Sequence, residues 1–236
     1  MRIFSCFVVF AAFLSVSTAD AQEMDCSAWH TSTFFKTAKA ADVERCLERG
    51  ADVTALIEWD RTPLLWATLL GGIDVVALLI ERGADVNEQA EEDWTPLVAT
   101  VVNQRLDVAT LLIEKGAYVN APDGYGWTPL YNAVDTENAD MVTLLIGNGA
   151  DVNARIDGCW TPLHRAVLND NIDVVALLID SGAHLDAQNE GNCAPLHVAE
   201  ENGSPGAAEF LIEKGADVVT PSNCEESGLI PPHSVG

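Results

Sequence analysis

A repeat of 33 residues constrains this chain more than any other feature of its sequence. The tripeptide Thr-Pro-Leu begins at Thr62, Thr95, Thr128 and Thr161, and Ala194-Pro195-Leu196 is a degenerate fifth copy. A Gly-Ala pair keeps the same step, beginning at Gly50, Gly83, Gly116, Gly149, Gly182 and Gly215. Because two separate markers share one period, the chain is expected to fold as a row of tandem units.

The residues of one unit predict two helices. Thr62 is a suitable N-cap, and Pro63 follows in the first turn, where its missing N–H costs nothing. After a Gly-Gly break, residues 73–80 form an apolar segment that predicts a second helix, and Gly83 ends it. The apolar surface of this second helix is too broad to be buried within one unit. The sequence therefore predicts an all-α solenoid in which neighbouring units stack.

About six units are expected. Residues 22–57 form a degenerate first unit that would cap the stack, and residues 222–236 form an irregular tail without periodicity. The five units between them are expected at residues 58–90, 91–123, 124–156, 157–189 and 190–221.

One unit carries a recognisable motif. Residues 161–166 read Thr-Pro-Leu-His-Arg-Ala, residues 172–179 read Ile-Asp-Val-Val-Ala-Leu-Leu-Ile, and Gly182-Ala183 follows. This order resembles the ankyrin repeat. The resemblance implies antiparallel helix pairs with hairpin loops at right angles to them, so that loops and first helices line a concave groove. The family histidine remains only as His164 and His197, and the family glycine between the helices is replaced by Gln104, Glu137 and Asp170.

The N-terminus reads as an export signal. Arg2 precedes a mostly apolar run of 14 residues, and small residues follow up to Ala21. We expect residues 1–21 to be a signal peptide cleaved after Ala21, or alternatively after Ala19. An uncleaved membrane anchor is the other reading, but the run is shorter than the roughly 20 residues that span a bilayer. The mature protein is thus expected to be periplasmic or secreted, without a membrane span.

The chain is strongly acidic, with 12 Lys and Arg, 36 Asp and Glu, and a formal net charge of -24 at pH 7. Such a charge disfavours binding to nucleic acid or to an anionic membrane and favours a partner with a basic surface.

Five cysteines remain after removal of the leader: Cys26, Cys46, Cys159, Cys193 and Cys224. An odd number leaves at least one free or paired outside the chain. Cys26 and Cys46 could form a disulfide across the first unit, whereas Cys46 could equally be a small core residue of its helix. A bridge between Cys159 and Cys193, on neighbouring loops, would need a local shift because stacked units lie about 10 Å apart.

No residue constellation predicts catalysis. His164 and His197 occupy the position at which the ankyrin resemblance implies bonds between neighbouring loops, so a structural role is expected for both. The acidic residues after Gly-Ala recur with the repeat, which is typical of turn formation. No nucleophile elbow, phosphate-binding loop or zinc-protease motif occurs, and no cysteine has metal-ligand spacing with a histidine. We expect no enzymatic activity, no cofactor and no metal.

Three tryptophans, Trp94, Trp127 and Trp160, precede Thr-Pro-Leu at successive units. The resemblance implies that this loop position faces the groove, where indoles could anchor a partner. Alternatively, each indole could lie along the neighbouring loop and brace it. We predict a binding face that combines aromatic, acidic and aliphatic side chains. Its residues are Trp94, Tyr125, Trp127, Trp160, Glu91, Glu92, Asp93, Asp157, Leu69 and Leu70.

The predicted function is that of an exported, monomeric scaffold that binds another protein through its acidic concave face. Three specific roles remain open: an accessory or protective factor for an enzyme of the same compartment, an inhibitor or immunity protein against a basic toxin or hydrolase, or a secreted effector of host proteins.

Overall fold

The computed structural model describes residues 25–89 and 94–218 of the 236-residue chain. Within these ranges the protein consists of α-helices and short 3-10 segments, without strands. The predicted all-α solenoid is confirmed. The expected signal peptide and the irregular tail at 222–236 lie outside the described residues.

In the described residues, six antiparallel helix pairs follow one another along the stack. The first helices are α1 (Ser32–Thr37), α3 (Pro63–Leu70), α5 (Pro96–Val102), α7 (Pro129–Asp135), α9 (Pro162–Leu168) and α11 (Pro195–Asn202). The second helices are α2 (Ala40–Glu48), α4 (Ile73–Glu81), α6 (Leu106–Glu114), α8 (Ala139–Gly147), α10 (Ile172–Asp180) and α12 (Pro205–Glu213). From α3 to α11, each first helix begins 33 residues after the previous one.

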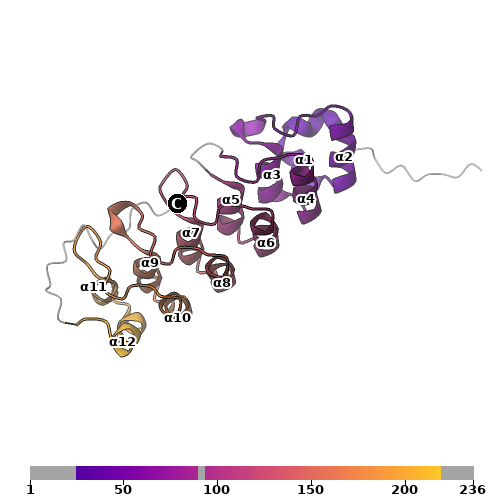
Figure 1. Ribbon diagram of the computed structural model, residues 1–236. Helices are drawn as coiled ribbons and strands as arrows, with labels where there is room; N and C mark the ends of the chain where they lie inside the picture. Colours follow the sequence, from indigo (N-terminus) through magenta and orange to yellow (C-terminus); the bar gives the residue numbers. More distant parts are fainter. Residues whose placement is uncertain (1–24, 90–93, 219–236) are drawn as a thin grey trace, which may run out of the picture.

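The pairs form two parallel rows (Figure 1). First helices contact first helices of the neighbouring units, and second helices do the same, so every internal pair is covered on both sides. The core runs the length of the stack and is made of fully buried aliphatic side chains such as Leu64, Val76, Leu97, Leu130 and Leu178. This stacking explains why the apolar surface of each unit is too broad for one helix pair.

Threonine caps begin the internal first helices, as predicted. The hydroxyls of Thr62, Thr95 and Thr128 accept hydrogen bonds from the backbone N–H three residues later, at 3.1, 3.2 and 3.2 Å, and Pro occupies the first turn. Each second helix is followed two residues later by a glycine with φ between 88° and 97°. This left-handed conformation suits glycine, which therefore ends the helix without steric penalty.

At the position between the two helices of a unit, Gly203 has a φ of 74°, but three other units have no glycine there. Gln104, Glu137 and Asp170 take its place with φ of 56°, 55° and 51°, a region that non-glycine residues rarely adopt. Asp170 offsets this cost through its carboxylate, which accepts a hydrogen bond of 2.8 Å from the Ala207 N–H at the start of α12. No described bond of this kind involves the Glu137 side chain.

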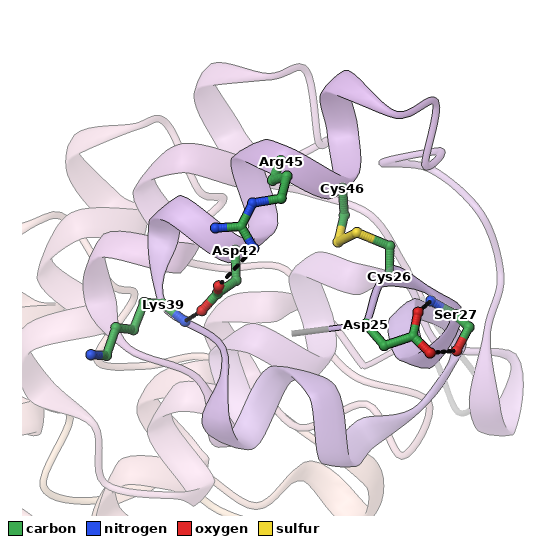
Figure 2. Close-up of a disulfide and its surroundings, with 7 residues drawn as sticks. All are labelled: Asp25, Cys26, Ser27, Lys39, Asp42, Arg45 and Cys46. Atoms are coloured by element: carbon green, nitrogen blue, oxygen red, sulfur yellow. Dashed lines mark hydrogen bonds and ion pairs between the residues drawn. A yellow bond between two sulfur atoms is a disulfide. The ribbon is translucent and has the colours of Figure 1, made fainter. Parts of the chain in front are cut away.

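The first unit is closed by a disulfide. Cys26, in the 3-10 helix η1 (Cys26–His30), is bonded to Cys46 in α2, with Cα atoms 5.4 Å apart (Figure 2). Cys46 is also 1% exposed, so both readings of this residue are correct. Trp29, Phe34 and Phe35 pack against one another in the same unit, with ring centroids 5.1–5.5 Å apart, and Phe35 meets the other two rings edge to face. Closing a loop of 20 residues stabilises a fold by roughly 3 kcal/mol. The disulfide therefore compensates for the short helix α1 of this end unit.

Candidate functional site

The loops between units are hairpins that project from the first-helix side of the stack. In four of them a backbone N–H donates to the carbonyl four residues later: Ile57 to Arg61, Asp123 to Trp127, Ile156 to Trp160, and Asn189 to Cys193, at 2.9 to 3.1 Å. Each hairpin ends immediately before the threonine, or Ala194, that begins a first helix. These four described hairpins therefore occupy the same place in their units and lie in a row.

The predicted tryptophan anchors are not exposed. Trp127 and Trp160 are each 1% exposed, and their rings pack on the first helix that follows, against Tyr131 at 5.0 Å and His164 at 5.6 Å between centroids. Trp94 is half-buried. The expectation that Trp127 and Trp160 present their indoles to a partner is corrected: both rings are buried against the first helix that follows. Burial of a large apolar ring is more favourable than leaving it in water, which accounts for this placement.

The other predicted residues differ in accessibility. Tyr125 is 37% exposed at a hairpin tip, and Asp157 is exposed at another tip. Leu70 is 40% exposed at the end of α3, whereas Leu69 is half-buried. The structure keeps all four on the loop and first-helix side. Glu91, Glu92 and Asp93 lie outside the described residues.

One carboxylate builds a loop and cannot reach a partner. Asp123 is 6% exposed and accepts hydrogen bonds from the N–H groups of Tyr125 and Trp127, at 3.0 and 2.9 Å, and from the Asn132 amide at 3.2 Å. These three hydrogen bonds fix the hairpin that carries Tyr125. The tip is thus held in one conformation before any partner arrives.

His164 ties two hairpins together, as expected. Its Nδ1 accepts a hydrogen bond from the Thr161 N–H at 3.2 Å, so Nε2 carries the proton and donates to the Cys193 carbonyl at 3.0 Å. The residue is fully buried, and burial lowers the pKa of its imidazole to about 4. Both nitrogens are occupied, so His164 has no free position for acid–base chemistry. At His197, Nδ1 similarly accepts from the Ala194 N–H at 3.3 Å.

Two arginines are bonded to neighbouring units through the first helices. Arg165 of α9 and Asp135 of α7 form an ion pair in which both side chains are less than one-fifth exposed. Arg105 donates to the carbonyls of Ala67, Thr68 and Gly71, at 3.1, 2.8 and 2.6 Å, and so caps α3. These two arginines are therefore engaged within the protein, while the Asp157 side chain is exposed at a hairpin tip.

Sequence reasoning missed a ladder of asparagines, defined here as Asn87, Asn120 and Asn153. Each amide donates to the carbonyl of the glycine that ends the next unit's second helix, at 3.0–3.1 Å. Each side-chain oxygen also accepts from a backbone N–H two residues after that glycine, at 2.7–2.8 Å. The signal was visible as asparagine at a 33-residue step. Its partners could not be inferred without the stack.

A second missed residue is Trp59, the most exposed large apolar side chain of the described residues, at 70%. It lies at the tip of the hairpin before α3, within the 3-10 segment η2 (Glu58–Asp60), two repeat periods before Tyr125. Because Trp59 and Tyr125 occupy equivalent positions of the 33-residue repeat, the repeat register would have identified Trp59 as a second tip residue.

The remaining described cysteines, Cys159 and Cys193, differ in their bonding. Cys159 is free and half-buried at a hairpin tip, and Cys193 is disulfide-bonded and fully buried. A bridge between these two residues is therefore not formed, and Cys224 lies outside the described residues.

Within residues 25–89 and 94–218 no cluster of three His, Cys, Asp or Glu side chains could hold a metal ion. No helix in these ranges is long and apolar enough to span a bilayer.

Comparison with known proteins agrees with this architecture. The family model described as "Ankyrin repeats (3 copies)" matches residues 34–123, 86–156 and 155–222. A search among curated proteins finds no significant match.

Proposed function

The chain belongs to the ankyrin repeat family, whose members generally mediate protein–protein binding and are typically non-enzymatic, and from this premise we propose that it is an exported scaffold that binds a basic protein. The binding face is the row of hairpin tips together with the adjoining first helices.

The observation that carries the proposal is the row of rigid hairpins. Buried indoles, His164 and Asp123 fix the loops from inside, and these residues leave tip side chains such as Tyr125 and Asp157 exposed. A preorganised surface loses little conformational entropy on association, which is the main advantage of a stiff scaffold in recognition. Loops positioned by such a scaffold are where binding residues concentrate.

The charge of the protein supports a basic partner. The net charge is -24, and several of the described arginines contact carboxylates or backbone carbonyls of the protein itself. The field around the stack would accelerate association with a positively charged surface and repel acidic ones.

Two features support export. The apolar run after Arg2 has the order of a signal peptide, and the disulfide between Cys26 and Cys46 is of a kind that persists in oxidising compartments.

The test begins with affinity capture by the tagged protein from the exported fraction, followed by mass spectrometry and titration of the purified partner. Replacement of Tyr125 by Ala together with Asp157→Asn should weaken binding more than tenfold, about 1.4 kcal/mol. The matched control is Glu114→Gln, a charge loss on the exposed end of α6 in the other helix row, which should leave affinity nearly unchanged. Equal affinity of the double variant and the wild type would move the site away from the hairpin row.

A further inference from the structure

The tip of the first described hairpin has a backbone that its sequence does not favour. Trp59 and Asp60 adopt φ of 61° and 50°, so both central residues of the turn are left-handed. This is the geometry of a type I′ turn, which normally requires Gly or Asn. In the hairpin three periods later, Gly158 and Cys159 adopt φ of 68° and 58°. Trp59 thus stands where the equivalent loop has glycine.

Packing does not explain why tryptophan is at this position. Its side chain is 70% exposed, and the loop is closed by other groups. Ile57 N–H donates to the Arg61 carbonyl at 2.9 Å, the Trp66 indole donates to the Glu58 carbonyl at 3.1 Å, and the Arg61 guanidinium lies 5.1 Å from the Trp66 ring. A bulky residue in the left-handed region is strained, and strain that packing does not offset is a mark of functional sites.

Acidic groups surround the exposed indole. Glu58 and Asp60 flank it and are both exposed. The Glu58 carboxylate accepts a hydrogen bond of 2.7 Å from the Ser32 N–H, which holds it beside the ring. This bond lowers the pKa of the Glu58 carboxyl, and the Trp59 indole N–H contributes a smaller effect in the same direction. An aromatic face next to negative carboxylates is the environment that an arginine or lysine side chain prefers.

We propose that Trp59 is the main anchor of the binding face and receives a cationic side chain of the basic partner on its indole ring. The inference rests on the proposed function and identifies the residues that perform it. Tyr125, at the same tip position two units further on, is the second contact. Neighbouring units are about 10 Å apart, so the two aromatic tips would engage cationic groups separated by about 20 Å.

The test uses a fluorescein-labelled Gly-Ser-Arg repeat peptide as the probe, its Gly-Ser-Glu counterpart as the charge-reversed control, and fluorescence anisotropy as the readout. Trp59→Gly should weaken binding of the arginine peptide at least about tenfold. Trp59→Tyr keeps an aromatic face and should remain within about threefold of the wild type. Tyr118→Ala removes an equally exposed aromatic side chain outside the row of tips and should have no effect.

The same variants separate function from structure. Because glycine relieves the left-handed strain, Trp59→Gly should raise the Tm by about 2 °C while it weakens binding. A lower Tm would show that Trp59 is a structural residue and would overturn the inference. Unchanged affinity of Trp59→Gly would also overturn it, although a loss of affinity in Tyr125→Ala would then leave the proposed function standing. Absence of binding to the wild type would overturn both.

Discussion

The stability of the second unit should fall as Glu88 ionises, and a single substitution can reveal this. Glu88 is half-buried, and its carboxyl accepts a hydrogen bond from the hydroxyl of Thr62, the N-cap of α3. Burial raises the pKa of this carboxyl from its ordinary 4.5 to about 7, while the Thr62 hydroxyl acts in the opposite direction. The folded protein therefore binds the proton of Glu88 more tightly than the unfolded chain does.

The sign and size of the effect follow from linkage. A carboxyl with a raised folded-state pKa contributes stability that is fully present below pH 4.5 and is lost as the pH rises through about 7. The difference between the two pKa values corresponds to at most about 3 kcal/mol, and partial solvent access reduces it to about 1–2 kcal/mol. Glu88→Gln, which mimics the protonated form, should match the wild type near pH 4.5 and exceed its free energy of unfolding by that amount at pH 8.

Urea unfolding followed by circular dichroism at a series of pH values between 4.5 and 8 measures this difference. Glu81→Gln is the matched control, because Glu81 is exposed at the end of α4 in the same unit. A difference between Glu88→Gln and the wild type that stays constant across this pH range would refute the reasoning.

Three further predictions concern the stack. Asn120→Ala removes the bonds to the Gly149 carbonyl and the Asp151 N–H and should lower the free energy of unfolding by about 1–2 kcal/mol in urea titrations; a loss below about 0.3 kcal/mol would mean that the asparagine ladder adds no stability. Glu137→Gly should stabilise the protein by about 0.5 kcal/mol, because glycine adopts the positive φ of this position without strain. Asp170→Gly has the same backbone geometry but should destabilise the protein by about 1 kcal/mol, because the hydrogen bond from the Ala207 N–H is lost. Shifts of the same sign in the thermal unfolding of the two variants would contradict this. Burial lowers the folded-state pKa of His164 from its ordinary 6.5 to about 4, so its contribution to the free energy of unfolding is present above pH 6.5 and is lost as the pH falls. Between pH 7 and pH 4 the free energy of unfolding of the wild type should therefore fall by about 2–3 kcal/mol more than that of His164→Gln. Parallel pH profiles of the two proteins would refute this.

The predictions for Glu88 and His164 act in opposite directions over an overlapping pH range. Protonation of Glu88 stabilises the fold as the pH falls, and protonation of His164 destabilises it. The pH profile of the wild type alone would therefore conceal both effects. Comparison with each variant separates them, because the two groups lie in different units.

Much of the fold follows from local chemistry that the sequence displays. The 33-residue period, the threonine caps and the glycines that end the second helices are short-range signals, and each one stands where the structure has the corresponding helix boundary. The bracing role of His164 was also predictable, because the ankyrin resemblance assigns a role to that repeat position and the structure has the same bond to the next loop.

The candidate site was less predictable, because the same repeat position can point inwards or outwards. Trp127 and Trp160 share a period with each other, and so do Trp59 and Tyr125, yet only the second pair is exposed. Periodicity identifies equivalent positions, but it does not tell which of their side chains the fold buries.

The sequence by itself determined that the chain is a row of helix pairs, since capping, helix termination and apolar spacing operate over a few residues. Only the tertiary structure decided which indoles are buried, which cysteines are bonded and which carboxyl holds its proton. Trp127 is buried against Tyr131, Cys46 is bonded to Cys26 across the first unit, and Glu88 contacts Thr62, 26 residues away in the sequence. Burial and pairing of these groups depend on residues that the chain fold brings together, and the short-range signals of the sequence do not show these contacts.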